Sequence, residues 1–215
     1  MENRDIIKGV IFDLDGVIVH TDEFHYLAWK QLADKIGVYF DRTINERLRG
    51  VSRMASLDII LERSDAAFSD TEKQLLADEK NDTYRELLKT LTPADVSADV
   101  KSTLAALRQN GLKLAIGSSS KNARFILNQI GLENYFDAIS DGNNISKSKP
   151  DPEVFLKAAE YLCLKSEQCI VVEDAEAGIQ AAKNGGFTAA GIGGASKYNL
   201  TDISLNLLSD LLKYV

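Results

Sequence analysis

The sequence has 215 residues, of which 45% are hydrophobic and 27% charged, and its formal net charge is -7. A chain of this length buries roughly 70% of its unfolded surface on folding, so it needs no disulfide or metal staple. The acidic balance argues against nucleic acid as a partner, because phosphate backbones are bound by clustered Lys and Arg. No apolar run approaches the ~20 residues that cross a bilayer. The charged N-terminus also predicts no signal peptide, so we expect a cytosolic protein with no membrane partner.

Short apolar runs of the kind that form buried parallel strands recur along the chain. They predict strands at 6–12, 113–117, 137–140, 169–173 and 187–192. Between the later runs, helical patterns predict helices at about 98–109, 122–130, 152–161 and 175–184. Strands that alternate with helices at this spacing indicate an α/β fold with a doubly wound, Rossmann-like parallel sheet.

One long segment does not follow this alternation. From about 22 to 92 the pattern is helical throughout, and no run within this segment has the pattern of a strand. Seventy helical residues far exceed the length that a crossover between strands requires. We therefore predict an inserted all-helical cap at 21–92 and a core domain formed by 1–20 and 93–215.

Polar groups of four kinds fall at or just after strand ends, where open α/β sheets bind ligands. Asp13 and Asp174 each follow an apolar strand, so their carboxylates can converge on a hard cation such as Mg²⁺. Alone, the DLDG stretch could be a helix cap, GSSS a cap and KPDP a turn with a helix start. The joint pattern favours a phosphate site over these readings. The residues concerned are Asp13, Asp15, Ser118, Lys149, Glu173 and Asp174.

The order DxDG, small hydroxyl, Lys-Pro and Glu-Asp resembles the four-motif pattern of the haloacid dehalogenase superfamily over residues 7–192. The resemblance implies that Asp13 is a nucleophile that accepts a phosphoryl group and that Asp15 moves the proton of the bridging oxygen. It implies that Ser118 holds a phosphate oxygen and that Lys149 neutralises its charge. Mg²⁺ would be bound by Asp13, the backbone carbonyl of Asp15, and Asp174 helped by Glu173. The Lys149–Pro150 bond is a candidate cis peptide, since X-Pro bonds pay only ~0.5–1 kcal/mol for that isomer.

The cap stretches TDEFH, RGVSRMAS and KND resemble the β-phosphoglucomutase family of this superfamily. The resemblance implies that Arg53 and the Ser120–Asn122 loop hold the phosphate that is not transferred. It places Thr21 and His25 at the hinge, where they couple cap closure to Asp15, while His20 stands where family members usually carry Asp. The remaining residues would line the substrate cavity. The full implied set is Thr21, His25, Trp29, Gly50, Val51, Ser52, Arg53, Ser56, Lys80, Ser120, Lys121 and Asn122.

The resemblance implies a monomeric phosphomutase that acts on a small sugar phosphate. The reaction would interconvert β-glucose 1-phosphate and glucose 6-phosphate, with β-glucose 1,6-bisphosphate as activator and intermediate and a phosphorylated Asp13. Two alternatives stay open. A Mg²⁺-dependent sugar-phosphate or phosphoglycolate-like phosphatase would share the same core residues. A catalytically silent metal- or phosphate-binding regulator would share the fold, although intact Asp13, Asp15, Lys149 and Asp174 weigh against it.

Overall fold

The computed structural model describes residues 7–48 and 51–215. The chain divides into two compact units, which we call the core unit (Met1–His20 with Thr92–Val215) and the cap unit (Thr21–Leu91). Thr92, which we expected in the helical insertion, belongs to the core unit, where its hydroxyl accepts a hydrogen bond from the Ala94 amide at 3.3 Å.

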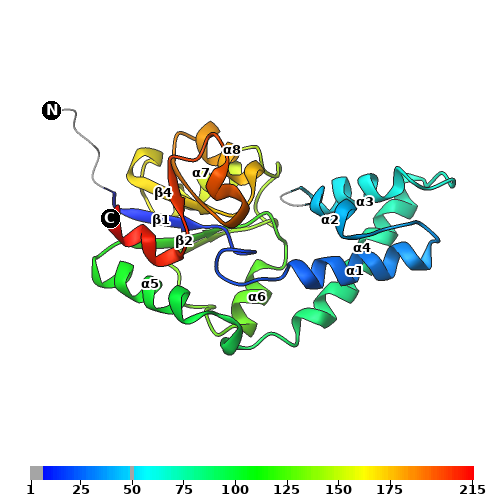
Figure 1. The fold of residues 1–215 in the computed structure, drawn as a ribbon, viewed down its shortest axis with the longest axis horizontal. Coiled ribbons are helices and arrows are strands. Elements are labelled where there is room, and N and C mark those ends of the chain that lie inside the picture. The colour runs from blue at the N-terminus through cyan, green and yellow to red at the C-terminus, as the bar shows by residue number, and fades with distance from the viewer. Residues whose placement is uncertain (1–6, 49–50) are drawn as a thin grey trace. The chain divides into compact units, whose positions relative to one another are not determined.

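The core unit is built on a six-stranded parallel sheet with the strand order β3-β2-β1-β4-β5-β6 (Figure 1). This confirms the predicted doubly wound α/β fold. The last strand was not predicted from the sequence, because Ile203–Leu205 has an exposed serine in its middle and lacks the continuous apolar run of the other strands. The strands are β1 (Gly9–Phe12), β2 (Lys113–Gly117), β3 (Ala138–Ser140), β4 (Cys169–Glu173), β5 (Thr188–Ile192) and β6 (Ile203–Leu205).

Helices cover both faces of this sheet. Figure 1 shows α7 and α8 on one face of the sheet and α5 on the other. Under α7 and α8 lies an apolar cluster that includes Ile11, Phe155, Val171 and Ile179, all fully buried. The helices are α5 (Ala98–Gln109), α6 (Ala123–Gln129), α7 (Glu153–Tyr161) and α8 (Glu176–Asn184), with short 3-10 helices at Pro93–Asp95, Ser166–Gln168, Gly193–Lys197 and Leu208–Lys213.

Strand β1 lies at the point where the strand order reverses, between β2 and β4. Phe12, its last residue, is in register with Ile116 of β2 and Val172 of β4. The residues that follow these three strands therefore emerge side by side at one edge of the sheet. Such a switch point at the carboxyl ends of parallel strands is where open α/β sheets bind ligands.

The cap unit is all-helical. Ser69 begins the longest helix with a capping box, in which its hydroxyl accepts from the Glu72 amide and Glu72 accepts from the Ser69 amide. An apolar cluster that includes Trp29, Leu57 and Ala77 fills the interior. Within the described ranges, no helix is long and apolar enough to cross a membrane. The helices are α1 (Asp22–Lys35), α2 (Arg42–Glu46), α3 (Arg53–Leu61) and α4 (Asp70–Leu88).

Candidate active site

The turn that follows β1 presents the first two candidate residues. Asp13 is buried, and its backbone N–H donates to the Val172 carbonyl at 2.9 Å, which continues the β1–β4 ladder by one residue. Asp15 is partly buried two residues on. Gly16 then adopts φ +84°, a conformation that side-chain-bearing residues seldom adopt. A Cβ at Gly16 would also lie 2.6 Å from Cγ of Asp174, so glycine leaves the space that the Asp174 carboxylate occupies.

Lys149 brings a buried positive charge to this edge of the sheet. Its ammonium donates to Oδ1 of Asp13 at 2.5 Å and to Oε1 of Glu173. The Lys149–Pro150 peptide bond is cis, as predicted. Burial disfavours the charged ammonium, but the Asp13 and Glu173 carboxylates outweigh it and raise the pKa of Lys149 above its usual range. Lys149 is therefore a permanent cation beside the carboxylate of Asp13.

Glu173 is the last residue of β4, and Asp174 follows it. Val172 is in register with Phe12, so Glu173 lies beside Asp13. Besides its contact with Lys149, Glu173 accepts through Oε2 from the amides of Asp174 and Ala175 at 3.0 and 3.1 Å. Burial, with the nearby Asp13 and Asp174 charges, raises the pKa of the Glu173 carboxyl above its usual value, and the Lys149 ammonium opposes this effect. Glu173 thus joins the ammonium of Lys149 to the turn that carries Asp174.

The acidic groups at this edge fit a divalent cation. Asp13, Glu173 and Asp174 each offer one carboxylate oxygen, and these three oxygens lie within 4.8 Å of one another. Carboxylate oxygens are the protein ligands that Mg²⁺ prefers. Three carboxylates around one ammonium also leave excess negative charge, which is costly in a buried site unless a cation compensates it. Glu173 already accepts hydrogen bonds through both oxygens, so Asp13 and Asp174 are the better-placed carboxylate ligands.

The loop after β2 carries Ser118, Ser120 and Asn122. Ser118 is buried, and its backbone N–H donates to the Ser140 carbonyl at 3.0 Å. Its hydroxyl oxygen accepts from the Ser120 amide, and the Ser120 hydroxyl accepts from the Asn122 amide, both at 3.1 Å. Asn122 is buried and Lys121 is exposed. The sequence thus folds into two consecutive serine turns that place the Ser118 hydroxyl one residue beyond the sheet.

In the cap unit, the three predicted side chains of His25, Trp29 and Lys80 form one cluster with Tyr84. Nζ of Lys80 lies 2.9 Å from Nδ1 of His25, and the same ammonium lies 4.7 Å from the Trp29 ring centre and 4.5 Å from the Tyr84 ring centre. The His25 and Tyr84 rings stack at 4.0 Å. Tyr84 was not predicted, although its position four residues after Lys80 on one helix places both on the same face. Burial, then the Lys80 and Arg53 charges, hold the pKa of His25 well below its usual value.

Arg53 opens helix α3 and faces α4. Its Nη2 donates to Oδ1 of Asn81 at 2.8 Å, and its Nη1 lies 3.8 Å from Oδ1 of Asp78. Burial lowers the pKa of the guanidinium, and the charges of Asp78 and Asp82 oppose that effect. Asn81 belongs to the KND stretch that carries the family resemblance, but it was not predicted as a site residue. Asp78 was not singled out, because polar residues on a charged helix such as α4 are common without any special role.

The other predicted cap residues have simple local surroundings. Ser52 is the N-cap of α3, and its hydroxyl accepts from the Ala55 amide at 3.2 Å. Ser56 and Thr21 are buried, and the Thr21 carbonyl accepts from the His25 amide at 3.1 Å. Val51 is partly buried. The predicted position Gly50 lies outside the described residues.

Comparisons with known proteins agree with this arrangement. A family model described as haloacid dehalogenase-like hydrolase matches residues 7–186. The β-phosphoglucomutase of Bacillus subtilis is 42% identical to this chain over 207 residues, which cover 95% of this chain and 92% of the relative. The fructose-1-phosphate phosphatase of Escherichia coli is 32% identical over 86% of this chain and 95% of the relative.

A solved structure gives the same result. The crystal structure of β-phosphoglucomutase from Clostridium difficile superposes with a TM-score of 0.91 at 38% identity, and covers 97% of this chain and 95% of that one. The family match and these alignments confirm the resemblance that the four sequence motifs predicted. The chain belongs to the haloacid dehalogenase-like hydrolase family.

Proposed function

We propose that the chain is a phosphomutase that interconverts β-glucose 1-phosphate and glucose 6-phosphate through β-glucose 1,6-bisphosphate and a phosphorylated Asp13. The observation that supports phosphoryl transfer is the contact of Asp13 with the buried Lys149 ammonium at the switch point of the sheet. The 42% identity to a relative named β-phosphoglucomutase, over 95% of this chain, supports the choice of substrate.

In the first half of the reaction, an Asp13 carboxylate oxygen attacks the phosphorus on C1 of bound β-glucose 1,6-bisphosphate, and glucose 6-phosphate is the product. An O–P bond to Asp13 forms, the O–P bond to the sugar breaks, and Asp15 gives its proton to the departing sugar oxygen. In the second half, Asp15 takes the proton from the 6-hydroxyl of β-glucose 1-phosphate, whose oxygen attacks the phosphorus of phospho-Asp13. The O–P bond to Asp13 breaks, which frees the Asp13 carboxylate and forms β-glucose 1,6-bisphosphate again. Asp15, partly buried, needs the protonated form for the first half and the ionised form for the second.

The remaining core residues hold the transferring group. Lys149 neutralises part of its negative charge, which is the main requirement of phosphoryl transfer. The Ser118 hydroxyl donates to one of its oxygens. Asp13 and Asp174, with Glu173 behind them, would hold Mg²⁺ together with the Asp15 carbonyl. When bound, Mg²⁺ supplies charge neutralisation at the phosphoryl oxygens and shields the carboxylates from one another.

A mutase has to hold its bisphosphate by the phosphate that is not being transferred. Arg53 suits this task, because a guanidinium binds a phosphate through two parallel hydrogen bonds. Ser120, Lys121 and Asn122 would contribute further donors. A well-placed sugar hydroxyl has an effective concentration of roughly 10⁵ M or more, which lets it outcompete water for phospho-Asp13.

The test is a coupled assay for glucose 6-phosphate from each anomer of glucose 1-phosphate, with Mg²⁺ and β-glucose 1,6-bisphosphate present and free phosphate measured in parallel. We expect product from the β anomer only, with little phosphate release. Phosphate released as fast as glucose 6-phosphate would make the protein a sugar-phosphate phosphatase. A protein that neither isomerises the sugar nor cleaves an artificial phosphate ester would be a silent binding protein.

A further inference from the structure

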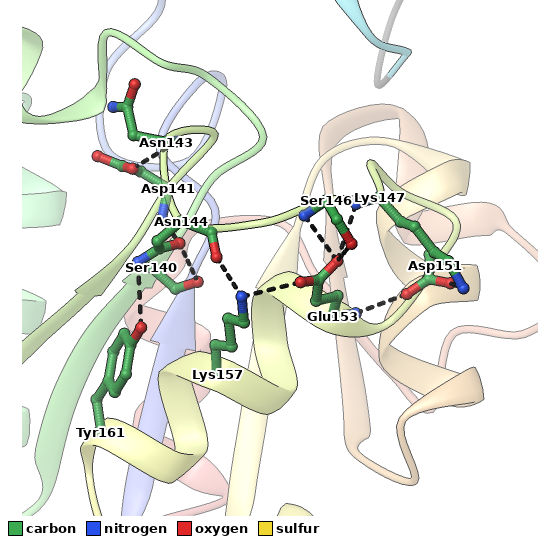
Figure 2. A network of polar contacts seen from close by, with 10 residues as sticks. All are labelled: Ser140, Asp141, Asn143, Asn144, Ser146, Lys147, Asp151, Glu153, Lys157 and Tyr161. Carbon is green, nitrogen blue, oxygen red and sulfur yellow. Dashed lines mark hydrogen bonds and ion pairs between the residues drawn. The ribbon is translucent and has the colours of Figure 1, made fainter.

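The segment between β3 and α7, residues 141–152, delivers Lys149 to the site without being part of a helix or strand. Its backbone is fixed instead by a continuous network of side-chain contacts (Figure 2). The Lys149 ammonium contacts the Asp13 and Glu173 carboxylates directly, so a small shift of this segment would move the ammonium away from the reacting group. The groups that hold the segment therefore bear directly on the chemistry.

Glu153, the first residue of α7, is the main anchor. Its Oε2 accepts three hydrogen bonds from the segment: from the Ser146 amide at 2.9 Å, from the Ser146 hydroxyl at 2.8 Å and from the Lys147 amide at 2.8 Å. Figure 2 shows these contacts converging on one carboxylate. The anchored amides lie two and three residues before Lys149. A carboxylate in the first turn of a helix is also favoured by the helix dipole.

Lys157 extends the anchor to the start of the segment. Its ammonium lies 2.9 Å from Oε1 of Glu153, one turn earlier on α7, and also donates to the Asn144 carbonyl. Asn144 in turn accepts through Oδ1 from the Asp141 amide at 3.0 Å. The Asn143 side chain donates to the Lys121 carbonyl at 3.0 Å. One network thus joins the segment that carries Lys149 to the loop that carries Ser118 and Ser120.

We propose that Glu153 is a positioning residue for Lys149 and acts by fixing the backbone at Ser146 and Lys147. The inference rests on the proposed function, in which Lys149 stabilises the transferring phosphoryl group. Both carboxylate oxygens of Glu153 are engaged by Ser146, Lys147 and Lys157, so its influence on the reaction passes through the segment. The pairing with Lys157, then the bonds from Ser146 and Lys147, lower the pKa of Glu153 to about 2, which keeps the anchor ionised at neutral pH.

The first experiment replaces the carboxylate by its neutral isostere, in Glu153→Gln, with Glu160→Gln on the same helix as the matched control. Glu160 is exposed, so its replacement removes one charge from α7 and leaves the segment anchored. We expect Glu153→Gln to lower kcat about 10- to 100-fold with KM changed less than about threefold, because a displacement of about 1 Å costs up to ~100-fold in rate. Amide hydrogen exchange at Ser146 and Lys147 should become at least about tenfold faster, and Glu160→Gln should change neither quantity.

The second experiment tests whether Glu153 acts through Lys149. Phosphorylation of Asp13 by acetyl phosphate is followed by intact mass in four proteins: wild type, Glu153→Gln, Lys149→Met and the double variant. If Glu153 only positions the Lys149 ammonium, Glu153→Gln should slow the reaction in the wild-type background and change it less than about twofold once that ammonium is gone. Effects of residues that act through each other are non-additive in this way.

Three results would overturn the inference. Faster exchange at Ser146 and Lys147 with unchanged kcat would show that the anchor is structural only. An equal loss from Glu153→Gln in both backgrounds would show that Glu153 acts independently of Lys149. A wild-type protein that fails to form phospho-Asp13 and to isomerise the sugar would instead refute the proposed function, and the inference with it. In that case the exchange data alone would report on the anchor.

Discussion

Gly178 offers a sharp test of how the site is packed. It lies in the first turn of α8, and a Cβ built there would overlap Cδ and Oε1 of Glu173 and lie 2.5 Å from its Cγ. In an exposed helix interior, Gly→Ala would stabilise the protein by up to ~1 kcal/mol through helix propensity. Here the methyl group must push aside a buried carboxylate that accepts from Lys149 and from the Asp174 and Ala175 amides.

The two effects have opposite signs, and steric overlap should dominate. Overpacking costs ~1–3 kcal/mol, and separating a buried ammonium from one of its carboxylates adds part of the ~3–5 kcal/mol that breaking a buried pair costs. We expect Gly178→Ala to lower the free energy of unfolding by about 2–4 kcal/mol in urea titrations. Gly194→Ala is the control, since the nearest atom to its added Cβ is 3.6 Å away. An equal or higher stability for Gly178→Ala would refute the packing of Glu173 against α8.

Three further predictions follow from the site. Asp13→Asn should abolish phosphoryl transfer while the variant still folds, because asparagine keeps the side-chain volume, and appreciable turnover by the folded variant would contradict a nucleophilic Asp13. Arg53→Ala should lower mutase flux about 10- to 1,000-fold, as expected for the loss of ~1.5–4 kcal/mol of charge-assisted contacts. Phosphorylation of Asp13 by acetyl phosphate should stay nearly unchanged, and an equal loss of both activities would argue against Arg53 as the group that binds the second phosphate. Because the pKa of His25 is lowered in the folded protein, the unfolded chain binds a proton below pH ~6.5 that the folded chain does not bind. The free energy of unfolding should therefore fall as the pH drops below ~6.5, by at most ~1.4 kcal/mol per pH unit. His25→Gln should flatten that slope in urea titrations at pH 5–7.

The fold was predictable because the signals that define it are local. The apolar runs before Asp13 and at 169–173 have the length and composition of buried parallel strands, and helices 98–109 and 153–161 carry a clear 3.6-residue period. Strand β6 escaped prediction because the exposed Ser204 lies in the middle of Ile203–Leu205, which therefore lacks a continuous apolar run. Its place at the sheet edge is set by pairing with β5, which no local pattern encodes.

Some features of the candidate site could likewise be predicted from the sequence, and others could not. Asp13 and Glu173 could be predicted together because strands in a parallel sheet deliver their carboxyl ends to one edge. Lys149 lies in the segment 141–152 beyond β3, and its place beside them was predicted from the resemblance of the Lys-Pro motif. The contacts that hold Lys149 in place could not be predicted, because they end on backbone groups: the Ser146 and Lys147 amides and the Asn144 and Lys121 carbonyls. Any residue supplies such groups, so they leave no signature in the sequence.

A family motif identifies a reacting side chain but not the contacts that position it. The Lys-Pro motif identifies Lys149 as the cation, but it does not identify the contacts that hold its ammonium 2.5 Å from Asp13. Those contacts come from Glu153 and Lys157, which are spaced four residues apart on α7. From the sequence alone, this spacing predicts only a solvated helical ion pair with a small effect on stability. Their stability contribution can be that small while their effect on rate is large, because rate depends on where the Lys149 ammonium lies rather than on how firmly α7 is folded. Substitutions at such positions should therefore separate activity from stability.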